Sequence, residues 1–278
     1  MSNTRDSLGD RMKKYEYITR THLVPRTPVI IRLDGRAFHT FTKGFKRPFD
    51  LVFAKAMQET MRHLCESIQG CVLGYTQSDE ITLILVDYQT LDTDGWFDYN
   101  IQKVVSIAAA SATLIFNRAL YDAVSEYLQT DKVKADLHSK DLAVKERTKK
   151  YVETLKNAVI KGGMFDARCF NLPKEEVANC LLWRQNDATR NSIESVGQAY
   201  FSAKQLHEKS CKMIQDMLLT EKNINWNNYP TMLKRGCCCV KVSTQEDNSR
   251  QRWIIDREIP IFKGEGRNYI NSRIYVGE

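Results

Sequence analysis

Three acidic residues stand beside short apolar segments of the chain, where strands would end and turn. Asp34 follows the apolar residues 29–33, and Asp79 and Glu80 lie in the short connection between two further apolar segments. Carboxylates held close together repel each other unless a cation lies between them, and hard oxygen ligands suit Mg²⁺. Two such ions, about 3.5–4 Å apart, would stabilise the attacking and leaving oxygens of an in-line phosphoryl displacement. The pattern therefore indicates metal-dependent phosphoryl transfer.

Hydrophobic spacing predicts the elements that would hold the first carboxylate. Residues 29–33 form an apolar run that Pro28 precedes, which indicates a buried strand ending at Asp34. From Asp50, a residue type that can cap a helix, apolar side chains recur every three or four positions as far as Ile68. Asp34 would thus stand in the turn between a strand and the segment that leads to a helix.

The elements that follow complete an order of strands and helices that is found in a common fold. Residues 71–75 and 81–86 are strand-like and are separated by few enough residues to form a hairpin. An alanine-rich helical pattern runs from about residue 101 to residue 128, and a further strand is expected at 168–172. The order β-α-β-β-α-β is that of a ferredoxin-like fold, the core of a polymerase palm. In that fold the first strand neighbours the hairpin, so the separated carboxylates would meet.

The expected fold class is α+β, an antiparallel sheet flanked by helices, with a helical insertion and a C-terminal extension. Residues 1–130 would form the N-terminal part of a palm-like catalytic domain, and residues 162–278 its remainder and the extension. Between them, residues 131–161 show helical spacing and a basic bias, with nine Lys or Arg against four Asp or Glu over residues 132–161. This insertion is either an arm that packs on a partner subunit or a solvated surface helix.

Composition limits the class of protein. The 278 residues are 42% apolar and carry a formal net charge of +7, which suits a polyanionic partner without requiring one. No uninterrupted apolar run approaches the ~18 residues of a membrane-spanning helix, and the first residues lack the apolar segment of a secretory signal. The eight cysteines include no C-x-x-C pair, which favours free thiols over structural zinc. We expect a cytoplasmic protein without a membrane partner.

A basic loop follows the first carboxylate. Its cationic and imidazole side chains are Arg36, His39, Lys43, Lys46 and Arg47. Such cations beside metal-bound carboxylates would make a receptor for a triphosphate. The glycine after the first aspartate lets the backbone approach closely, so the carbonyl oxygen of this glycine is a candidate third ligand. Taken singly, each acidic segment is more often a solvated turn; the strand order that joins the two segments favours a site.

Several motifs, taken together, resemble one family. They occur in the same order as in that family, over most of the chain from about residue 12 to residue 236. The motifs are Arg32-Leu33-Asp34-Gly35-Arg36-Ala37-Phe38-His39, then Pro48 and Asp50, Gln77-Ser78-Asp79-Glu80, Phe165-Asp166-Ala167-Arg168, Trp183-Arg184-Gln185 and Asn223-Ile224-Asn225-Trp226-Asn227. The chain resembles the tRNA-histidine guanylyltransferase superfamily.

This resemblance implies nucleotide addition in the reverse, 3′-to-5′ direction on a palm-like domain with two Mg²⁺ ions. The 5′ end of a tRNA would be activated with ATP or GTP, and the 3′-hydroxyl of an incoming nucleoside triphosphate would then attack that end. Family members are typically tetramers, so the resemblance implies a homotetramer.

The resemblance also implies roles for individual residues. Asp34, Asp79 and the Gly35 carbonyl would bind the metal ions, and Glu80 occupies a further family position where its charge could hold the geometry of the site. Lys103 matches a basic family position, although a helix-surface lysine is the plainer interpretation. The other residues expected to contact the nucleotide or to assist its activation are Gly35, Arg36, Ala37, Phe38, His39, Ser78, Arg32, Lys46, Arg47 and Asp50.

One departure from the family pattern concerns the choice of tRNA. Members that add guanylate to histidine tRNA carry a His-Ile-Asn-Asn-Leu-Tyr-Asn motif shortly after Trp183-Arg184-Gln185. Here the corresponding stretch is Thr189-Arg190-Asn191-Ser192-Ile193-Glu194-Ser195. The chain therefore looks more like the bacterial and archaeal-type branch, whose members repair 5′-truncated tRNAs by templated addition.

Templated repair of 5′-truncated tRNAs is the expected function, and three alternatives differ from it in what the chain would do. Guanylate addition to histidine tRNA is the first. A nucleotidyl cyclase on the same palm core is the second, although the sequence lacks the Gly-Gly-[Asp/Glu]-Glu-Phe hairpin of diguanylate cyclases. A non-catalytic RNA-binding protein is the third, based on Trp226, Tyr229, Lys234 and Arg235. The carboxylate pair opposes this last alternative, because acidic residues facing RNA phosphates weaken binding unless metals neutralise them.

Overall fold

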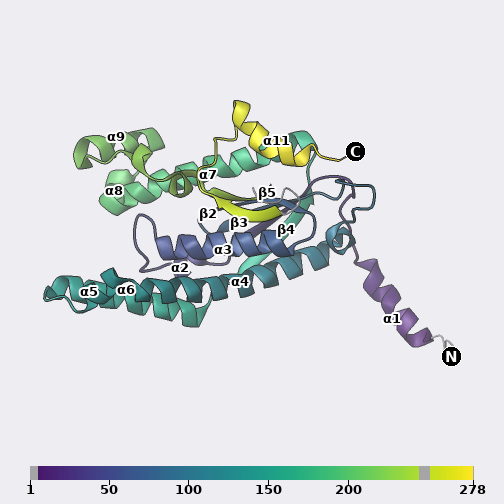
Figure 1. Cartoon of the computed structure of the whole chain (residues 1–278), viewed down its shortest axis with the longest axis horizontal. Helices are drawn as coiled ribbons and strands as arrows, with labels where there is room; N and C mark the ends of the chain where they lie inside the picture. The colour runs from purple at the N-terminus through teal and green to yellow at the C-terminus, as the bar shows by residue number, and fades with distance from the viewer. Residues whose placement is uncertain (1–5, 244–250, 278) are drawn as a thin grey trace.

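The computed structural model describes residues 6–243 and 251–277. At its centre is a six-stranded sheet in which all neighbouring strands are antiparallel. Helices cover both faces of this sheet (Figure 1). In their order across the sheet, the strands are β4 (Phe165–Asn171), β1 (Val29–Gly35), β3 (Glu80–Leu85), β2 (Cys71–Gln77), β5 (Cys237–Ser243) and β6 (Gln251–Asp256).

The first four strands confirm the predicted fold class. Their spatial order is β4-β1-β3-β2, with α3 (Leu51–Ser67) between β1 and β2 and α4 (Ile101–Gln129) between β3 and β4. This is the ferredoxin-like arrangement. Strand β4 begins at Phe165 rather than at residue 168, because its pairing with β1 continues as far as Gly35. The extra pairs place Asp166 directly beside Asp34.

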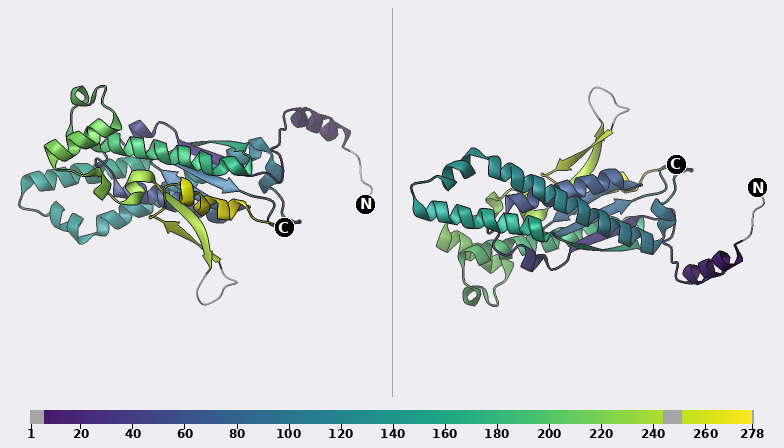
Figure 2. Two further views of the ribbon diagram at one scale, coloured as in Figure 1. Left: turned by 90° about the horizontal axis from the view of Figure 1, so that it is seen from above. Right: turned by 90° about the horizontal axis from the view of Figure 1, so that it is seen from below.

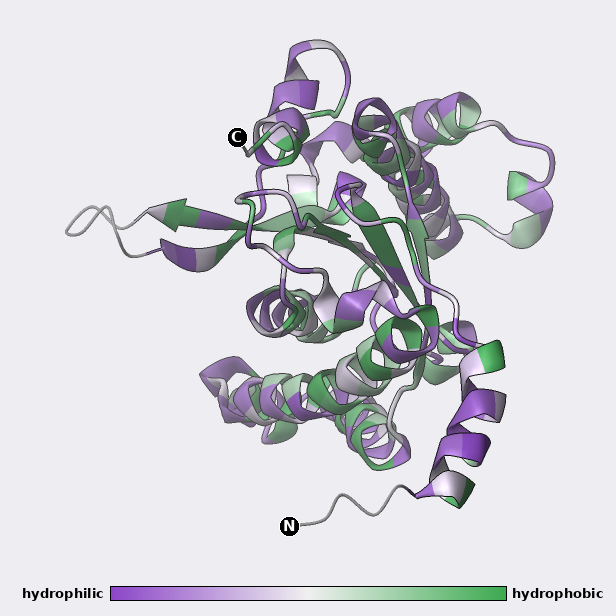
Figure 3. Cartoon of the chain, turned by 90° about the vertical axis from the view of Figure 1, so that its right-hand side faces the viewer, coloured by the Kyte–Doolittle hydropathy of each residue, from purple (hydrophilic) through white to green (hydrophobic). Residues whose placement is uncertain are grey.

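Side chains of β1 alternate between the two faces of the sheet. Ile31 and Leu33 are buried in the core shared with α3 and α4, whereas Ile30 belongs to the core shared with α7 (Lys174–Tyr200). Because side chains along a strand alternate with a period of two, Arg32 and Asp34 lie on the α7 side. Figure 3 shows the strands largely in the hydrophobic colour between these two layers of helices.

A single carboxylate begins α3. Asp50 Oδ1 accepts hydrogen bonds from the backbone N–H groups of Val52 and Phe53, over 3.0 and 3.1 Å. Such an N-cap satisfies donors that the first turn of a helix leaves without partners. The helix then follows the predicted apolar spacing, with Met57, Met61 and other side chains on its buried face.

Helix α4 is the longest helix of the described chain. No uninterrupted apolar run of membrane-spanning length exists in the sequence, yet α4 is long and apolar enough by composition to cross a membrane. Its inner face packs against α3 and β4, as in the core helix of a globular protein. The buried residues on that face are Val104, Ala108, Ala112, Phe116, Leu120, Ala123 and Val124.

The basic segment 131–161 is helical in the structure. It forms α5 (Asp131–Leu137) and α6 (Leu142–Lys161), which lie beside the end of α4 as an arm at the left of Figure 1. The remaining elements are α1 (Ser7–Ile18), α2 (Phe38–Phe41), η1 (Trp96–Tyr99), α8 (Ala203–Leu206), α9 (Cys211–Lys222), η2 (Trp226–Asn228), α10 (Thr231–Arg235), η3 (Gly264–Arg267) and α11 (Asn268–Ile274). Figure 2 shows α1 projecting at the end opposite to the arm.

Candidate active site

The acidic residues meet at one edge of the sheet. Strand β1 ends at Gly35, and a two-residue turn of Ser78 and Asp79 joins β2 to β3. Ser78 adopts the left-handed conformation, with a φ of 49°. Asp34 lies opposite Glu80, and the Gly35 N–H donates to the Asp79 carbonyl oxygen over 3.0 Å. The strand order therefore brings the two separated acidic segments together.

Asp34 and Asp79 form no ion pair within residues 6–243 and 251–277. Burial raises the pKa of the Asp79 carboxyl, hydrogen bonds from Ser78 and from its own backbone lower it, and the charge of Asp34 raises it again. The net shift is upward. The two carboxylates thus repel each other electrostatically in a partly buried place, so a cation bound between them would be stabilised.

Glu80 is in the opposite situation, although it follows Asp79 directly. Its side chain is 6% exposed, and Oε1 accepts a hydrogen bond of 2.7 Å from Arg184 Nε. Arg32 Nε lies 3.8 Å from the other carboxylate oxygen. Burial raises the pKa of Glu80, Arg184 and Arg32 lower it, and the charge of Asp34 raises it again, so that the net shift is upward. Glu80 is therefore neutralised by arginines and holds α7 against the sheet.

The oxygen atoms available at the acidic edge suit the way in which proteins usually bind Mg²⁺. No group of three or more His, Cys, Asp or Glu side chains within the described chain is placed to hold a metal ion. The neighbouring Asp166 is paired with Arg168 over 2.9 Å, which leaves Asp34, Asp79 and the Gly35 carbonyl as donors. Mg²⁺ is usually bound by one or two carboxylates, with water and substrate phosphates completing its shell. These residues suit that mode of binding.

Beside the acidic edge lies a cleft of about 550 Å³. Its walls come from five segments: the loop after β1, the start of α3, the β2–β3 turn, the middle of α7, and the passage from α10 into β5. Cavities of about 300–1,000 Å³ accommodate small ligands and cofactors. Apolar and polar residues both line the cleft, and they include Phe49, Met57, Met232, Gln77, Ser78, Asp79, Asn191, Ser195 and Gln198.

Most of the predicted nucleotide-binding residues lie at this cleft. His39, Lys46, Arg47, Asp50 and Ser78 line its wall. Arg36 and Ala37 are exposed on the adjoining turn and are not among the lining residues. The roles of all these residues in binding a nucleotide stay predictions.

Phe38 lines the wall of the cleft and also packs in the hydrophobic core. It is 2% exposed and packs against the rings of Phe41, Phe116 and Phe165, with centroids 4.9, 5.3 and 5.1 Å away. A Cβ atom at Gly35 would stand 2.5 Å from the Phe38 ring, so this position requires glycine for close packing. Phe38 thereby fixes the turn that follows Asp34.

The two cations of the loop point to different neighbours. Lys46 Nζ donates to the Tyr127 hydroxyl over 3.1 Å, on the side of the arm. Arg47 Nη1 reaches Gln198 of α7, 3.5 Å away on the other wall of the cleft. Arg47 is therefore the cation of this pair that spans the cleft.

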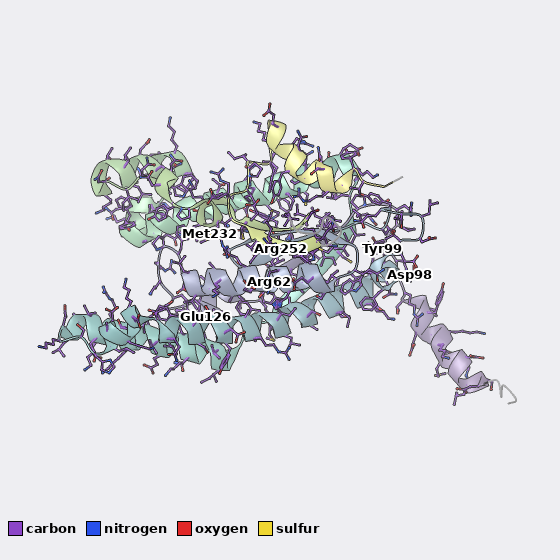
Figure 4. All side chains as sticks on the ribbon, viewed as in Figure 1. Arg62, Asp98, Tyr99, Glu126, Met232 and Arg252 are labelled. Atoms are coloured by element: carbon purple, nitrogen blue, oxygen red, sulfur yellow. The ribbon has the colours of Figure 1, made fainter. Side chains whose placement is uncertain are left out.

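Lys103 lies away from the cleft that most of the predicted nucleotide-binding residues line. It lines a second cavity of about 490 Å³, together with Arg20, His22 and Phe97. Figure 4 labels Asp98 and Tyr99 at this place, close to α1. Lys103 stands thirteen residues before Phe116, which is about 20 Å along a helix and away from the acidic edge. The structure does not bring Lys103 to the cleft.

Two further cleft residues, both glutamines, were not expected from the sequence. Gln198 of α7 and Gln58 of α3 line the cleft, and Gln58 Nε2 lies 3.3 Å from the sulfur of Met232, which Figure 4 labels. Lys234 is 8% exposed, donates to the Asn227 carbonyl over 2.5 Å, and has its pKa lowered, chiefly by burial. The motif around Arg184 was visible in the sequence, but no local pattern showed that it pairs with Glu80.

Comparison with known proteins agrees with this architecture. Over residues 9–173 the chain matches the family model described as "Thg1: tRNAHis guanylyltransferase". Two solved structures of a bacterial tRNA(His) guanylyltransferase (Thg1)-like protein, in complex with ATP and with GTP, each cover 98% of this chain and are themselves covered completely. Their sequence identities are 40% and 36%, and their TM-scores 0.78 and 0.75. A probable tRNA(His) guanylyltransferase of Dictyostelium discoideum is 24% identical over 267 residues, covering 87% of this chain and 91% of that protein.

A palm-like sheet with a carboxylate pair beside a ligand-sized cleft is the architecture of a nucleotidyltransferase. The family match specifies that class. The chain belongs to the tRNA(His) guanylyltransferase family and is a nucleotidyltransferase of that family.

Proposed function

We propose that this protein repairs 5′-truncated tRNAs by templated 3′-to-5′ addition of nucleotides, using two Mg²⁺ ions, and works as a homotetramer. The observation that carries the proposal is the Asp34–Asp79 pair, which forms no ion pair within the described chain and of which Asp79 lines the cleft. The bacterial relatives in complex with ATP and GTP support nucleoside triphosphates as substrates.

The reaction has two steps. A 5′-monophosphate oxygen of the tRNA attacks the α-phosphate of ATP or GTP and releases pyrophosphate. The 3′-hydroxyl of the incoming nucleoside triphosphate then attacks the activated 5′ phosphate and releases the nucleoside monophosphate. On a tRNA that already carries a 5′-triphosphate, the second step releases pyrophosphate directly.

Each group at the edge has a part in this scheme. Asp34, Asp79 and the Gly35 carbonyl would hold Mg²⁺, which lowers the pKa of the attacking hydroxyl and stabilises charge on the phosphoryl oxygens. Arg47 lines the cleft and would orient the triphosphate bound there. Glu80 and Arg184 hold the β2–β3 turn against α7, so the Asp79 carboxylate keeps its place.

The choice of repair over histidine-tRNA selection rests on α7. Ser192 of the divergent stretch is buried and accepts a hydrogen bond from the indole N–H of Trp226 over 3.0 Å, while Asn191 and Ser195 line the cleft. In the same stretch, Thr189 and Glu194 stand where histidine-selective members carry histidine and tyrosine. Base pairing with the opposite strand of the acceptor stem would then choose the nucleotide.

Incorporation of labelled nucleotides into 5′-truncated tRNAs tests the proposal. We expect Mg²⁺-dependent extension that follows the template base, with a changed template base changing the nucleotide added. Addition of guanylate only, and only to histidine tRNA, would replace repair with histidine-tRNA maturation. Cyclic nucleotide without RNA extension would favour the cyclase, and RNA retention on a filter without either product would favour a binding protein.

A further inference from the structure

One contact between the basic arm and the wall of the cleft is a hydrogen bond from a tyrosine. Tyr151 lies on α6, is 8% exposed, and donates its hydroxyl hydrogen to Asp50 Oδ2 over 2.6 Å. Asp50 is itself 8% exposed and lines the cleft. The two residues are 101 positions apart, so this hydrogen bond joins the insertion to the segment that follows β1.

The other hydrogen bonds of Asp50 are local. Oδ1 accepts the backbone N–H groups of Val52 and Phe53, and Oδ2 accepts the backbone N–H of Lys46 over 2.9 Å. Within the described chain, Tyr151 is thus the hydrogen-bond partner of the Asp50 carboxylate from outside residues 46–53. Without the Tyr151 hydroxyl, Asp50 could still cap α3, but nothing from the arm would fix its second oxygen.

Lys46 is held by the same tyrosine and its neighbour. Its ammonium nitrogen lies 4.3 Å from the centre of the Tyr151 ring and 4.6 Å from that of Tyr127 on α4. The two rings meet edge to face with centroids 5.4 Å apart. A cation over aromatic rings is stabilised by their quadrupoles. The arm therefore contacts the side chain of Lys46 directly and its backbone N–H through Asp50, while Arg47 is directed across the cleft.

We propose that Tyr151 is a positioning residue, which acts through Asp50 and Lys46 to hold residues 42–50 in the shape that binds the activating nucleoside triphosphate. That the bound ligand is the activating nucleoside triphosphate rests on the proposed function. That Tyr151 positions residues 42–50 rests on the contacts described above. It gives the insertion a task within the site: the arm braces the wall of the cleft. Tyr151 itself contacts protein groups and no reacting atom.

Hydrogen–deuterium exchange of the free protein tests the positioning without requiring activity. Tyr151→Phe keeps the ring and removes the hydroxyl. The matched control is Tyr269→Phe, which removes a similar hydrogen bond, from Tyr269 to Asp256 Oδ2 over 2.8 Å, in the core away from the cleft. We expect amides of residues 42–50 to exchange about tenfold faster in Tyr151→Phe, the loss expected for a hydrogen bond to a charged group. Exchange equal to that of wild type and the control would overturn the proposal.

Steady-state kinetics on two substrates locates the step. With a 5′-monophosphorylated truncated tRNA, Tyr151→Phe should raise the KM for ATP about tenfold, because the cleft wall is less well fixed. With a 5′-triphosphorylated tRNA, which needs no activation, its kcat/KM should stay close to that of Tyr269→Phe. Equal losses on both RNAs would contradict a role in binding the activating nucleotide. A wild-type enzyme that extends neither RNA would refute the proposed function, while hydrogen exchange would still decide the positioning.

Discussion

Asp79 and Glu80 are neighbours in the chain, yet their carboxylates meet opposite surroundings. Asp79 stands in the turn, close to Asp34 and without an ion pair in the described chain, whereas Glu80 is enclosed by Arg184 and Arg32. The alternation of side chains along a strand causes the difference, because Glu80 begins β3 and points at α7 while Asp79 belongs to the turn. A charge left without a protein partner is available to a ligand, and a charge already paired holds structure.

The largest expected effect concerns the unpaired carboxylates. Asp34→Asn and Asp79→Asn keep the shape of the side chains and remove the charges that would hold Mg²⁺. We expect extension of a 5′-triphosphorylated truncated tRNA to fall by roughly a thousandfold or more in each variant. Single-turnover assays at saturating RNA measure the loss. Activity within tenfold of wild type would show that the pair is not the metal site.

The paired carboxylate should matter for stability instead. Arg184→Met leaves Glu80 buried beside Arg32 alone, so the free energy of unfolding should fall by about 3 kcal/mol. Adding Glu80→Gln removes the uncompensated charge and should recover much of that loss. Urea denaturation of the single and double variants measures both quantities. Equal free energies of unfolding for Arg184→Met and for the double variant would show that Arg184 and Glu80 are not coupled.

A smaller effect is expected where the turn after Asp34 is packed. Gly35→Ala places a methyl group 2.5 Å from the Phe38 ring and should lower the free energy of unfolding by about 1–3 kcal/mol. When Phe38→Leu is added to Gly35→Ala, the added methyl group should lower the free energy of unfolding by less. Thermal denaturation of Gly35→Ala, Phe38→Leu and the double variant would show this coupling. Additive losses would mean that the ring does not set the requirement for glycine.

The smallest effect is a pH dependence in the absence of metal. Because the pKa of Asp79 is raised in the folded protein, folding favours its protonated form. The free energy of unfolding therefore falls as pH rises from the unfolded pKa, about 3.9, through the higher folded pKa. Asp79→Asn should abolish this contribution, of the order of 1 kcal/mol or less, and be the more stable protein at neutral pH in EDTA. A variant less stable than wild type there would contradict the repulsion.

The fold and the acidic pair could be predicted because both depend on local patterns. The apolar runs around Asp34 and Asp79 specify strands, and the order of strands and helices specifies which strands are neighbours. The Arg184–Glu80 and Tyr151–Asp50 contacts could not be predicted, because they join side chains more than a hundred positions apart. Lys103 shows the same limit: its family position was visible, but the course of α4 carries it away from the cleft.

Binding of Mn²⁺, a spectroscopic substitute for Mg²⁺, tests the contrast between the two neighbouring carboxylates most directly. Free Mn²⁺ would be measured by electron paramagnetic resonance in titrations of wild type, Asp34→Asn, Asp79→Asn and Glu80→Gln, each with a nonhydrolysable nucleoside triphosphate. We predict that wild type and Glu80→Gln bind Mn²⁺ with similar affinity and that both aspartate variants lose that binding. Loss of binding in Glu80→Gln as complete as in Asp79→Asn, or unchanged binding in the aspartate variants, would contradict the account.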